Sequence, residues 1–421
     1  MTDKHFDVLV VGAGPAGSIA ALVLARGGAR VALVDKATFP RDKACGDLIG
    51  PRGVQILHDL ALEFGEPMRV GDMVVVGPAG NRVRLPARPG RTYPSYGIVA
   101  QRSRFDETLQ QAAIAAGAEF IENRAEEPIG DDGRLAGFTL SSTTAVRADA
   151  VIGADGATSH VAAVTQLVEP ERVLWGFAVR TYLEETIEDP HIMLWTPTPG
   201  KGFPGYGWVF PAGNGHVNVG LGVGVLADRG AARRATRDLD DFLQHAARVG
   251  TLENRTPRRP SDERPLGAWL KMGLTGTTPT GERVLLVGDA AGLVNPLQGE
   301  GIAQAMATGR AAAEAILCGI DQSADRYRAH LARDHLPYLS TTASLQRTLL
   351  HRPRLTAALT RGLTAPGVGH VLSGAWSIAW NNLLDGAPAS TAAATATAAA
   401  GLGHLITTRS ADRRWIQNHA R

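Results

Sequence analysis

The feature that most constrains this chain is a glycine turn over Gly12–Gly17, placed directly between a strand and a helix. Residues 6–11 are a mostly apolar, valine-rich run, which is typical of a strand buried in a parallel sheet. The alanine- and leucine-rich residues 18–26 predict a helix, and residues 31–34 predict a second buried strand that ends at Asp35. This order predicts a strand–turn–helix–strand unit that binds a dinucleotide.

Each residue type in this turn has a physical reason to be there. The first glycine allows the tight turn, the second lets the backbone approach a pyrophosphate, and the third lets helix and strand pack closely. The N–H groups and positive dipole of the helix start favour phosphate. The acidic residue after the second strand would accept hydrogen bonds from an adenosine ribose. The predicted cofactor-binding residues of this unit are Gly12, Gly14, Ala16, Gly17, Asp35 and Lys36.

Two later segments have the same strand-and-turn character. One is Val284–Ala291, where Asp289 follows a strand and could bind a ribityl hydroxyl; Gly299 and Gly301 then open a helix whose N–H groups could face a flavin edge. The other is Gly153–Gly156, which contains Asp155. Taken alone, the first is better explained as a buried strand plus helix, and the second as a simple turn.

Taken together, the three segments resemble the three fingerprints of group A flavoprotein oxidoreductases, in the same order and at the same spacing. The resemblance implies FAD, rather than NAD, as the resident cofactor. Arg102 matches the arginine that those proteins place near the FAD phosphates. From the residues alone, an ordinary arginine at a helix start is an equally good interpretation.

Two more segments resemble the geranylgeranyl reductase family, and their sequences are most similar to those of the menaquinone isoprenyl-tail reductases. One is the K-x-C-G-D stretch within Phe39–Asp47, and the other is P-G-Y-G-W-x-F-P over 204–211. The resemblance extends from about residue 6 to about residue 345. It implies that Cys45 and Gly46 lie beside the flavin. Asp47 departs from the second glycine that many family members have, which puts the shape of this loop in doubt.

The residues of these segments also carry predictions of their own. Tyr206, Trp208 and Phe210 share one face of a strand because side chains alternate, so they form either an apolar substrate wall or ordinary core. Cys45 lies near Arg41 and Lys43, which could lower its pKa and make it a thiolate or a proton donor. The competing interpretation of Cys45 is a small buried hydrophobic residue. The other cysteine, Cys318, is predicted to lie in the core.

The predicted fold is α/β with an α+β second domain and a helical C-terminal region. The Rossmann-like FAD-binding domain is discontinuous and takes residues 1–68, 97–168 and 273–345. An antiparallel-sheet substrate domain takes residues 69–96 and 169–272, and residues 346–421 are helical. Strand patterns rich in glycine and aromatic residues over about 173–225 support the second sheet.

The resemblance implies an FAD-dependent enzyme that reduces an isoprenoid C=C bond by hydride transfer from reduced flavin, with Cys45 or a water it holds supplying the proton. An FAD-dependent monooxygenase acting on an aromatic or terpenoid substrate is the main alternative, because it shares the fingerprints. A flavin-dependent non-redox cyclase is a third alternative. A halogenase is disfavoured, since Tyr206 and Phe210 differ from its W-x-W-x-I-P segment. Without a second dinucleotide turn, the external reductant is NAD(P)H, ferredoxin or a quinol.

Composition excludes several function classes. A net charge of +2 gives no global field for nucleic acid, and the histidines show no metal-ligand spacing. Two cysteines fit a reducing cytosol, and neither a signal peptide nor an apolar run of about 18 residues is found. We therefore expect a cytoplasmic protein.

The C-terminal region offers two interpretations. Leu355, Leu359 and Leu363 recur every four residues, and Trp376 and Trp380 have the same spacing. We favour helices that cover the second domain. The alternative is a peripheral surface that rests on a membrane and admits a lipid tail.

Overall fold

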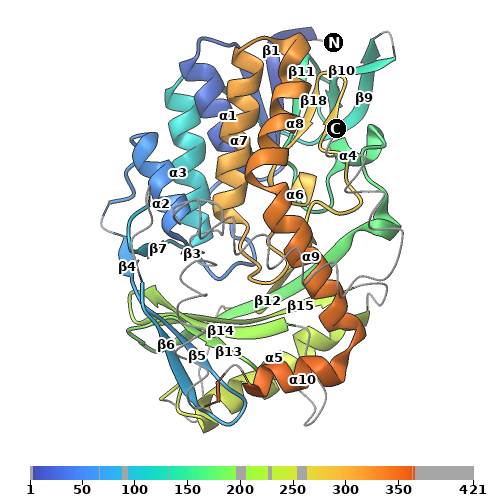
Figure 1. Ribbon diagram of the computed structural model, residues 1–421. Helices are drawn as coiled ribbons and strands as arrows, with labels where there is room; N and C mark the ends of the chain where they lie inside the picture. The colour runs from blue at the N-terminus through green and yellow to red at the C-terminus, as the bar shows by residue number, and fades with distance from the viewer. Residues whose placement is uncertain are drawn as a thin grey trace.

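Two large sheets frame the molecule, one in the upper part and one across the lower part of Figure 1. The computed structural model describes residues 3–65, 67–87, 93–131, 133–195, 205–225, 230–253, 263–362 and 364–365. Helices cover the front of the upper sheet, and one long helix lies below the lower sheet (Figure 1). This is the mixed α/β architecture that the sequence predicts.

The upper sheet is built around parallel pairs. β1 pairs in parallel with β2 and with β11, β2 pairs with β8, and β11 pairs with β18. Their core-facing residues are almost all valine, leucine, isoleucine and alanine, as expected of a parallel sheet buried on both faces. The strands of this sheet are β17 (Thr280–Gly281), β18 (Val284–Leu286), β11 (Ala145–Gly153), β1 (Asp3–Val11), β2 (Val31–Asp35), β8 (Glu119–Glu122), β10 (Arg134–Leu140) and β9 (Ala125–Asp131).

Helices α1 (Pro15–Arg26), α3 (Arg102–Ala115) and α7 (Ile302–Leu317) pack together over this sheet. α1 and α7 approach so closely that a Cβ at Gly309 would lie 2.1 Å from the Ala16 carbonyl oxygen. Small residues at this crossing therefore let α7 pack directly against α1, although the two helices are far apart in the sequence. The other helices are α2 (Pro51–Asp59), α4 (His160–Val164), α6 (Gly288–Ala291), α8 (Ser323–Asp334), α9 (Leu336–His351) and α10 (Pro353–Gly362).

The lower sheet is mostly antiparallel and is covered on one face by α5 (Gly230–Arg248). Phe242 of α5 is fully buried, and a Cβ at Gly207 would lie 2.2 Å from its ring, so helix and sheet touch directly. The opposite face turns toward the upper half (Figure 1). Its strands are, in order, β16 (Leu266–Met272), β12 (Leu174–Glu184), β15 (His216–Val225), β14 (Gly205–Gly213), β13 (His191–Met193), β5 (Met73–Val76) and β6 (Arg82–Leu85).

Several details differ from the sequence prediction. A small third sheet, which the sequence did not predict, joins β3 (Leu48–Ile49), β7 (Gly97–Val99) and β4 (Met68–Val70). Cys318 is exposed, and its expected place in the core is wrong, because it caps the C-terminal end of α7 at the surface. The domain boundaries stay a prediction.

Most of the C-terminal region falls outside the described residues, including the predicted helix near 368–384 and both of its tryptophans. Within the described part, α10 leaves Leu355 39% exposed. No helix among the described residues is both long and apolar enough to cross a bilayer.

Candidate dinucleotide and substrate site

The glycine turn has the shape that a bound pyrophosphate needs. Gly12 has a positive φ of 103°, and a Cβ there would lie 2.4 Å from the Ala154 oxygen; a Cβ at Gly17 would lie 1.8 Å from the Gly12 oxygen. Gly14 differs, since its Cβ would meet only Arg41 Nη2 at 3.5 Å. α1 begins here without a side-chain cap and without an acidic residue in its first turn. Its N–H groups and dipole therefore suit an anion, so the turn fits the phosphates of FAD.

Asp35 is half-buried at the end of β2 and lies against the glycine turn. Its carboxylate accepts hydrogen bonds from the Ala13 amide at 2.7 Å and from the Ala37 amide at 2.9 Å. These bonds hold the carboxylate at the edge of the turn, where an adenosine ribose is expected. The neighbouring Lys36 is exposed.

A cluster of two arginines and one aspartate lies behind the turn. Arg102, buried at the start of α3, donates two hydrogen bonds to Asp106, at 2.8 and 2.6 Å, and Arg41 Nη1 forms an ion pair with the same carboxylate at 2.8 Å. Burial opposes the charge of Arg102, but the Asp106 carboxylate outweighs it and raises the pKa of Arg102. Arg41 also lies beside Gly14. Arg41 was not among the predicted cofactor residues; its only sequence signal is a basic residue in the loop after β2.

Asp289 and Gly301, from the last of the three fingerprints, lie close to each other and near the glycine turn. Asp289, on α6, lies 3.5 Å from Lys43 Nζ, and a Cβ at Gly301 would lie 3.5 Å from its Oδ1. Gly301 is the N-cap of α7. Gly288 lies against Ala16, since a Cβ at Gly288 would be 3.2 Å from that side chain. The first and last fingerprints therefore meet in space.

Asp155 has a structural role in the described residues. Its carboxylate accepts hydrogen bonds from Ser159 Oγ at 2.5 Å and from the His160 amide at 2.6 Å, which fixes the start of α4. A cofactor role for Asp155 stays a prediction. Lys271 on β16 is buried nearby; burial lowers its pKa to about 8, while Asp155 and Asp289 act in the opposite sense. A single lysine in a strand gave no signal from which this residue could have been predicted.

The aromatic residues of β14 face the loops of the upper half. Trp208 and Phe210 are buried, and a Cβ at Gly46 would lie 3.0 Å from the Phe210 ring and 3.5 Å from Trp208 Nε1. Tyr206 is half-buried and donates a hydrogen bond to the Gln298 carbonyl oxygen, next to Gly299. The three side chains thus form part of an apolar cluster that also touches the predicted flavin-side loops.

Cys45 is half-buried, and its electrostatic surroundings differ from the prediction. Burial raises the pKa of the Cys45 thiol, and Arg102 opposes this only in part. The expected lowering by Arg41 and Lys43 is wrong, because these side chains pair with Asp106 and Asp289. A thiol with a raised pKa stays protonated at neutral pH, which fits a proton donor and not a thiolate.

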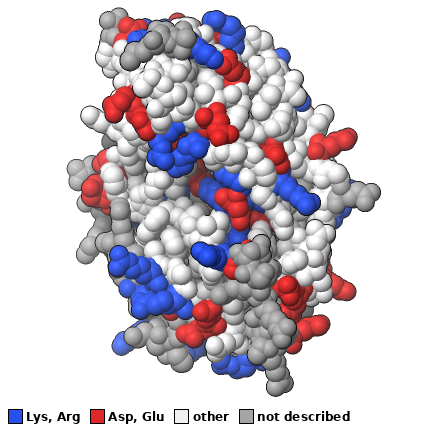
Figure 2. Space-filling model, turned by 180° about the vertical axis from the view of Figure 1, so that it is seen from behind, with Lys and Arg blue, Asp and Glu red and all other residues white. Residues whose placement is uncertain are grey.

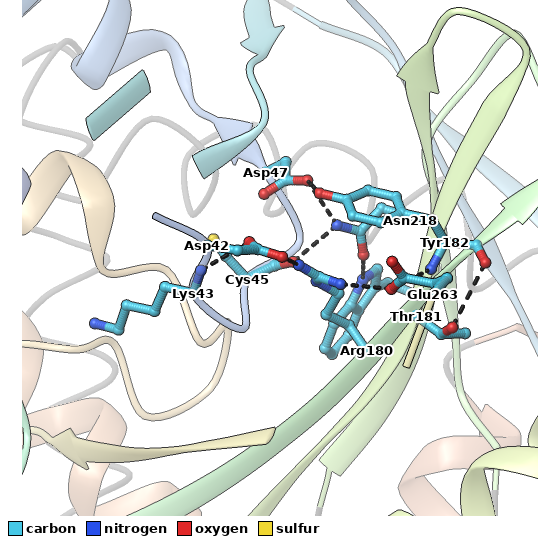
Figure 3. Close-up of polar contacts among 10 residues, drawn as sticks. Asp42, Lys43, Cys45, Asp47, Arg180, Thr181, Tyr182, Asn218 and Glu263 are labelled. Atoms are coloured by element: carbon cyan, nitrogen blue, oxygen red, sulfur yellow. Dashed lines mark hydrogen bonds and ion pairs between the residues drawn. The ribbon is translucent and has the colours of Figure 1, made fainter. Parts of the chain in front are cut away.

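A polar network joins this loop to the lower sheet (Figure 3). Asn218 on β15 donates hydrogen bonds of 2.8 Å to both the Cys45 carbonyl oxygen and Asp47 Oδ2, and its own oxygen accepts a 2.9 Å bond from Trp208 Nε1. Tyr182 on β12 also donates to Asp47. Burial raises the pKa of Asp47 to about 6, although both donors lower it. In the sequence, Asp47 stood out only as a departure from a family pattern.

The pKa of Asp47 has a consequence for stability. The folded protein keeps this proton up to about pH 6, whereas the unfolded chain loses it near 3.8, so the folded state binds more protons between these values. Stability should therefore fall as pH rises from 4 to 7, by about 2 kcal/mol from this group. We expect the free energy of unfolding of Asp47→Asn in urea to equal that of the wild type at pH 4. At pH 8 it should be higher than that of the wild type. An equal difference at both pH values would contradict the shift.

Charged side chains of both signs lie on the face of the molecule that Figure 2 presents. Figure 2 shows acidic and basic side chains interspersed over the face it presents, which argues against a large field of one sign there. Among the described residues there is also no group of three or more His, Cys, Asp and Glu side chains that could hold a metal ion.

Comparisons with known proteins agree with this geometry. Residues 5–330 match the family described as FAD binding domain. Menaquinone reductase of Mycobacterium tuberculosis is 38% identical over 321 residues, which cover 74% of this chain and 76% of that protein. Geranylgeranyl diphosphate reductase of Rhodobacter capsulatus is 33% identical over 334 residues, covering 74% and 75%.

Solved structures share the fold. A geranylgeranyl bacteriochlorophyll reductase-like protein from Thermoplasma acidophilum superposes with a TM-score of 0.71 at 22% identity, covering 91% of this chain and 99% of that one. A flavin-dependent brominase superposes with a TM-score of 0.67 at 18% identity, covering 96% and 100%. Because enzymes of different chemistry share it, the fold by itself does not select a reaction.

Proposed function

This chain belongs to the FAD-binding domain family and is an FAD-dependent oxidoreductase of the isoprenoid reductase group, and we propose that it reduces a C=C bond in a polyprenyl chain of the menaquinone-tail or geranylgeranyl type. The observation that carries this proposal is the packing of Trp208 and Phe210 against Gly46, the residue that directly follows Cys45. An apolar aromatic face next to a protonated thiol suits an alkene better than a polar substrate.

The residues proposed to hold FAD surround the glycine turn. The start of α1 would bind the pyrophosphate, with Arg41 and Arg102 behind it, and Asp35 would bind the adenosine ribose. Asp289 and the start of α7 would bind the ribityl chain and the flavin edge. When bound and reduced by NAD(P)H, ferredoxin or a quinol, FAD supplies hydride chemistry. The full proposed set is Gly12, Gly14, Ala16, Gly17, Asp35, Lys36, Arg41, Cys45, Gly46, Arg102, Asp155, Asp289, Gly299 and Gly301.

The protein's own contribution to the reaction is orientation and a proton. Tyr206, Trp208 and Phe210 would position the polyprenyl chain, because rigid aromatic side chains restrict an apolar ligand at little entropic cost. Cys45 would hold a proton at Sγ for the second alkene carbon. Burial favours the neutral thiol, so the proton is available over the physiological pH range.

The test is an anaerobic reduction. The FAD-loaded protein is reduced with dithionite and given menaquinone or geranylgeranyl diphosphate, and product mass is compared with that of an aerated sample. We expect a gain of two hydrogens without oxygen. Product that forms only in air and carries an added oxygen would replace this proposal with a monooxygenase.

The role of Cys45 is tested in the same assay. We expect Cys45→Ala to lower the rate of alkene reduction about 100-fold, because a positioned general acid contributes on that order. Cys318→Ala is the matched control, since Cys318 is exposed at the far end of α7, and it should keep the wild-type rate. Equal rates in the two variants would remove Cys45 from the reaction.

A further inference from the structure

We propose that Asp47 is a positioning residue that acts through Cys45: its buried carboxyl group returns a proton to the Cys45 thiolate after each turnover. The inference rests on the proposed role of Cys45 as proton donor. It assigns a task to a residue that the reaction as proposed above does not use.

Asp47 is a buried carboxyl group in an uncommon backbone conformation, with one of its two oxygens unpaired within the part of the chain that the structure describes. The side chain is fully buried, and its backbone has a positive φ of 59°, which non-glycine residues seldom adopt. Oδ2 accepts hydrogen bonds from Asn218 and Tyr182, while Oδ1 has no partner among the described residues. A buried oxygen without a donor is costly for a carboxylate and suits the protonated form.

The same contacts tie Asp47 to Cys45. The two residues are on one loop, and the Asn218 amide binds the Cys45 carbonyl oxygen and the Asp47 carboxylate at 2.8 Å each (Figure 3). The Asp47 carboxylate raises the pKa of the Cys45 thiol, so the two groups interact electrostatically. Trp208 binds the same asparagine, which couples the loop to the aromatic face.

The proton transfer is balanced and downhill. The O–H bond of the Asp47 carboxyl breaks and the S–H bond of Cys45 forms, leaving a carboxylate and a neutral thiol with no change in oxidation state. The pKa of Asp47 is about 6, and that of Cys45 is raised above its ordinary 9.0. Burial is the largest cause of the raised pKa of Cys45 and acts whether or not Asp47 is charged, so the equilibrium favours the neutral thiol and the Asp47 carboxylate.

Other charged groups also act on Asp47. On its own loop this is Cys45, on α3 it is Arg102, and on β12 these are Arg180 and Tyr182, with Glu263 paired to Arg180. Asp42 and Glu263 both accept from Arg180, which reduces the influence of that guanidinium. The two arginines lower the pKa of Asp47, but burial has the larger effect.

The first test titrates the thiol and does not depend on turnover. Iodoacetamide alkylation of Cys45 is followed against pH in the FAD-bound protein, with Cys318→Ala in the background to remove the exposed thiol. Since a neutral amide cannot repel the thiolate, Asp47→Asn should move the alkylation midpoint down by about one pH unit. An unchanged midpoint would overturn the inference.

The second test distinguishes the reprotonation of the Cys45 thiolate from the reduction of the alkene. For the wild type we expect single-turnover alkene reduction to be flat up to pH 8, whereas multiple turnover should decline above about pH 6. Asp47→Asn should leave the single-turnover rate within about threefold and lower multiple turnover at pH 6 at least about tenfold. A parallel fall of both rates, or no fall in either, would mean that Asp47 only shapes the loop.

Two further variants keep the outcome decisive. Tyr182→Phe removes a hydrogen bond to the charged form, so the multiple-turnover midpoint should move to higher pH; an unchanged midpoint would count against the inference. If Asp47→Asn fails to fold, Asp47→Gly replaces it, because glycine accepts the positive φ. If the wild type reduces no polyprenyl substrate but the thiol midpoint still shifts in Asp47→Asn, the proposed function fails and the Asp47–Cys45 coupling stands.

Discussion

Replacing Gly17 with alanine is expected to abolish FAD binding and to destabilise the fold. The added Cβ would lie 1.8 Å from the Gly12 backbone oxygen, a contact that no side-chain rotation can relieve. The start of α1 must therefore shift away from the turn, and overpacking of this kind costs about 1–3 kcal/mol or more. The measurement is retained flavin absorbance after gel filtration, together with the midpoint of urea unfolding.

Gly14→Ala tests the effect of an added Cβ on FAD binding separately from its effect on stability. Gly14 has φ −73°, and a Cβ there would meet only Arg41 at 3.5 Å, so the protein itself tolerates alanine. We expect the urea midpoint to stay at the wild-type value while the Kd for FAD rises at least about 100-fold, or about 2.7 kcal/mol. Wild-type FAD affinity in Gly14→Ala would mean that the pyrophosphate does not lie at this turn.

Removing the carboxylate of Asp106 should give the second large effect. Asp106 is fully buried, accepts hydrogen bonds from Arg102 and forms an ion pair with Arg41. Asp106→Ala would leave the guanidinium of Arg102 buried without its partner, which costs about 3–5 kcal/mol. We expect a correspondingly lower free energy of unfolding in urea, and weaker FAD binding because both arginines lie behind the turn.

The matched control is Glu314→Ala on α7. Arg310 and Glu314 form an ion pair with the same spacing of four residues as Arg102 and Asp106, but both of its side chains are substantially exposed. Solvent-exposed pairs contribute at most about 0.5 kcal/mol. Similar losses of stability in the two variants would show that burial of the Arg102–Asp106 pair is not what makes it strong.

The sequence allowed the class of fold and the resident cofactor to be predicted. The strand, turn and helix around Gly12–Gly17 are specified by neighbouring residues, through apolar runs, glycine and the helix start, and α7 begins directly after Gly301, as predicted. The alternation of Tyr206, Trp208 and Phe210 likewise follows from strand geometry. These features depend on residues within a few positions of one another, so local rules suffice.

The electrostatics of the site could not be predicted in this way. Arg41 and Lys43 are next to Cys45 in sequence, yet their partners are Asp106 and Asp289, far along the chain. The cation that acts on Cys45 is Arg102. Proximity in sequence therefore gave the wrong sign for the pKa shift of the thiol, because burial was not visible.

What the sequence by itself determined is the order of elements, the dinucleotide turn and the face of the aromatic strand, all set by short-range sterics and by the alternation of apolar residues. Only the tertiary structure decided which side chains are buried and which distant groups they meet. Asp47 shows this, since its partners Asn218 and Tyr182 are 171 and 135 positions away. Burial and long-range pairing control the pKa of a side chain, and both arise only when the two sheets are brought together.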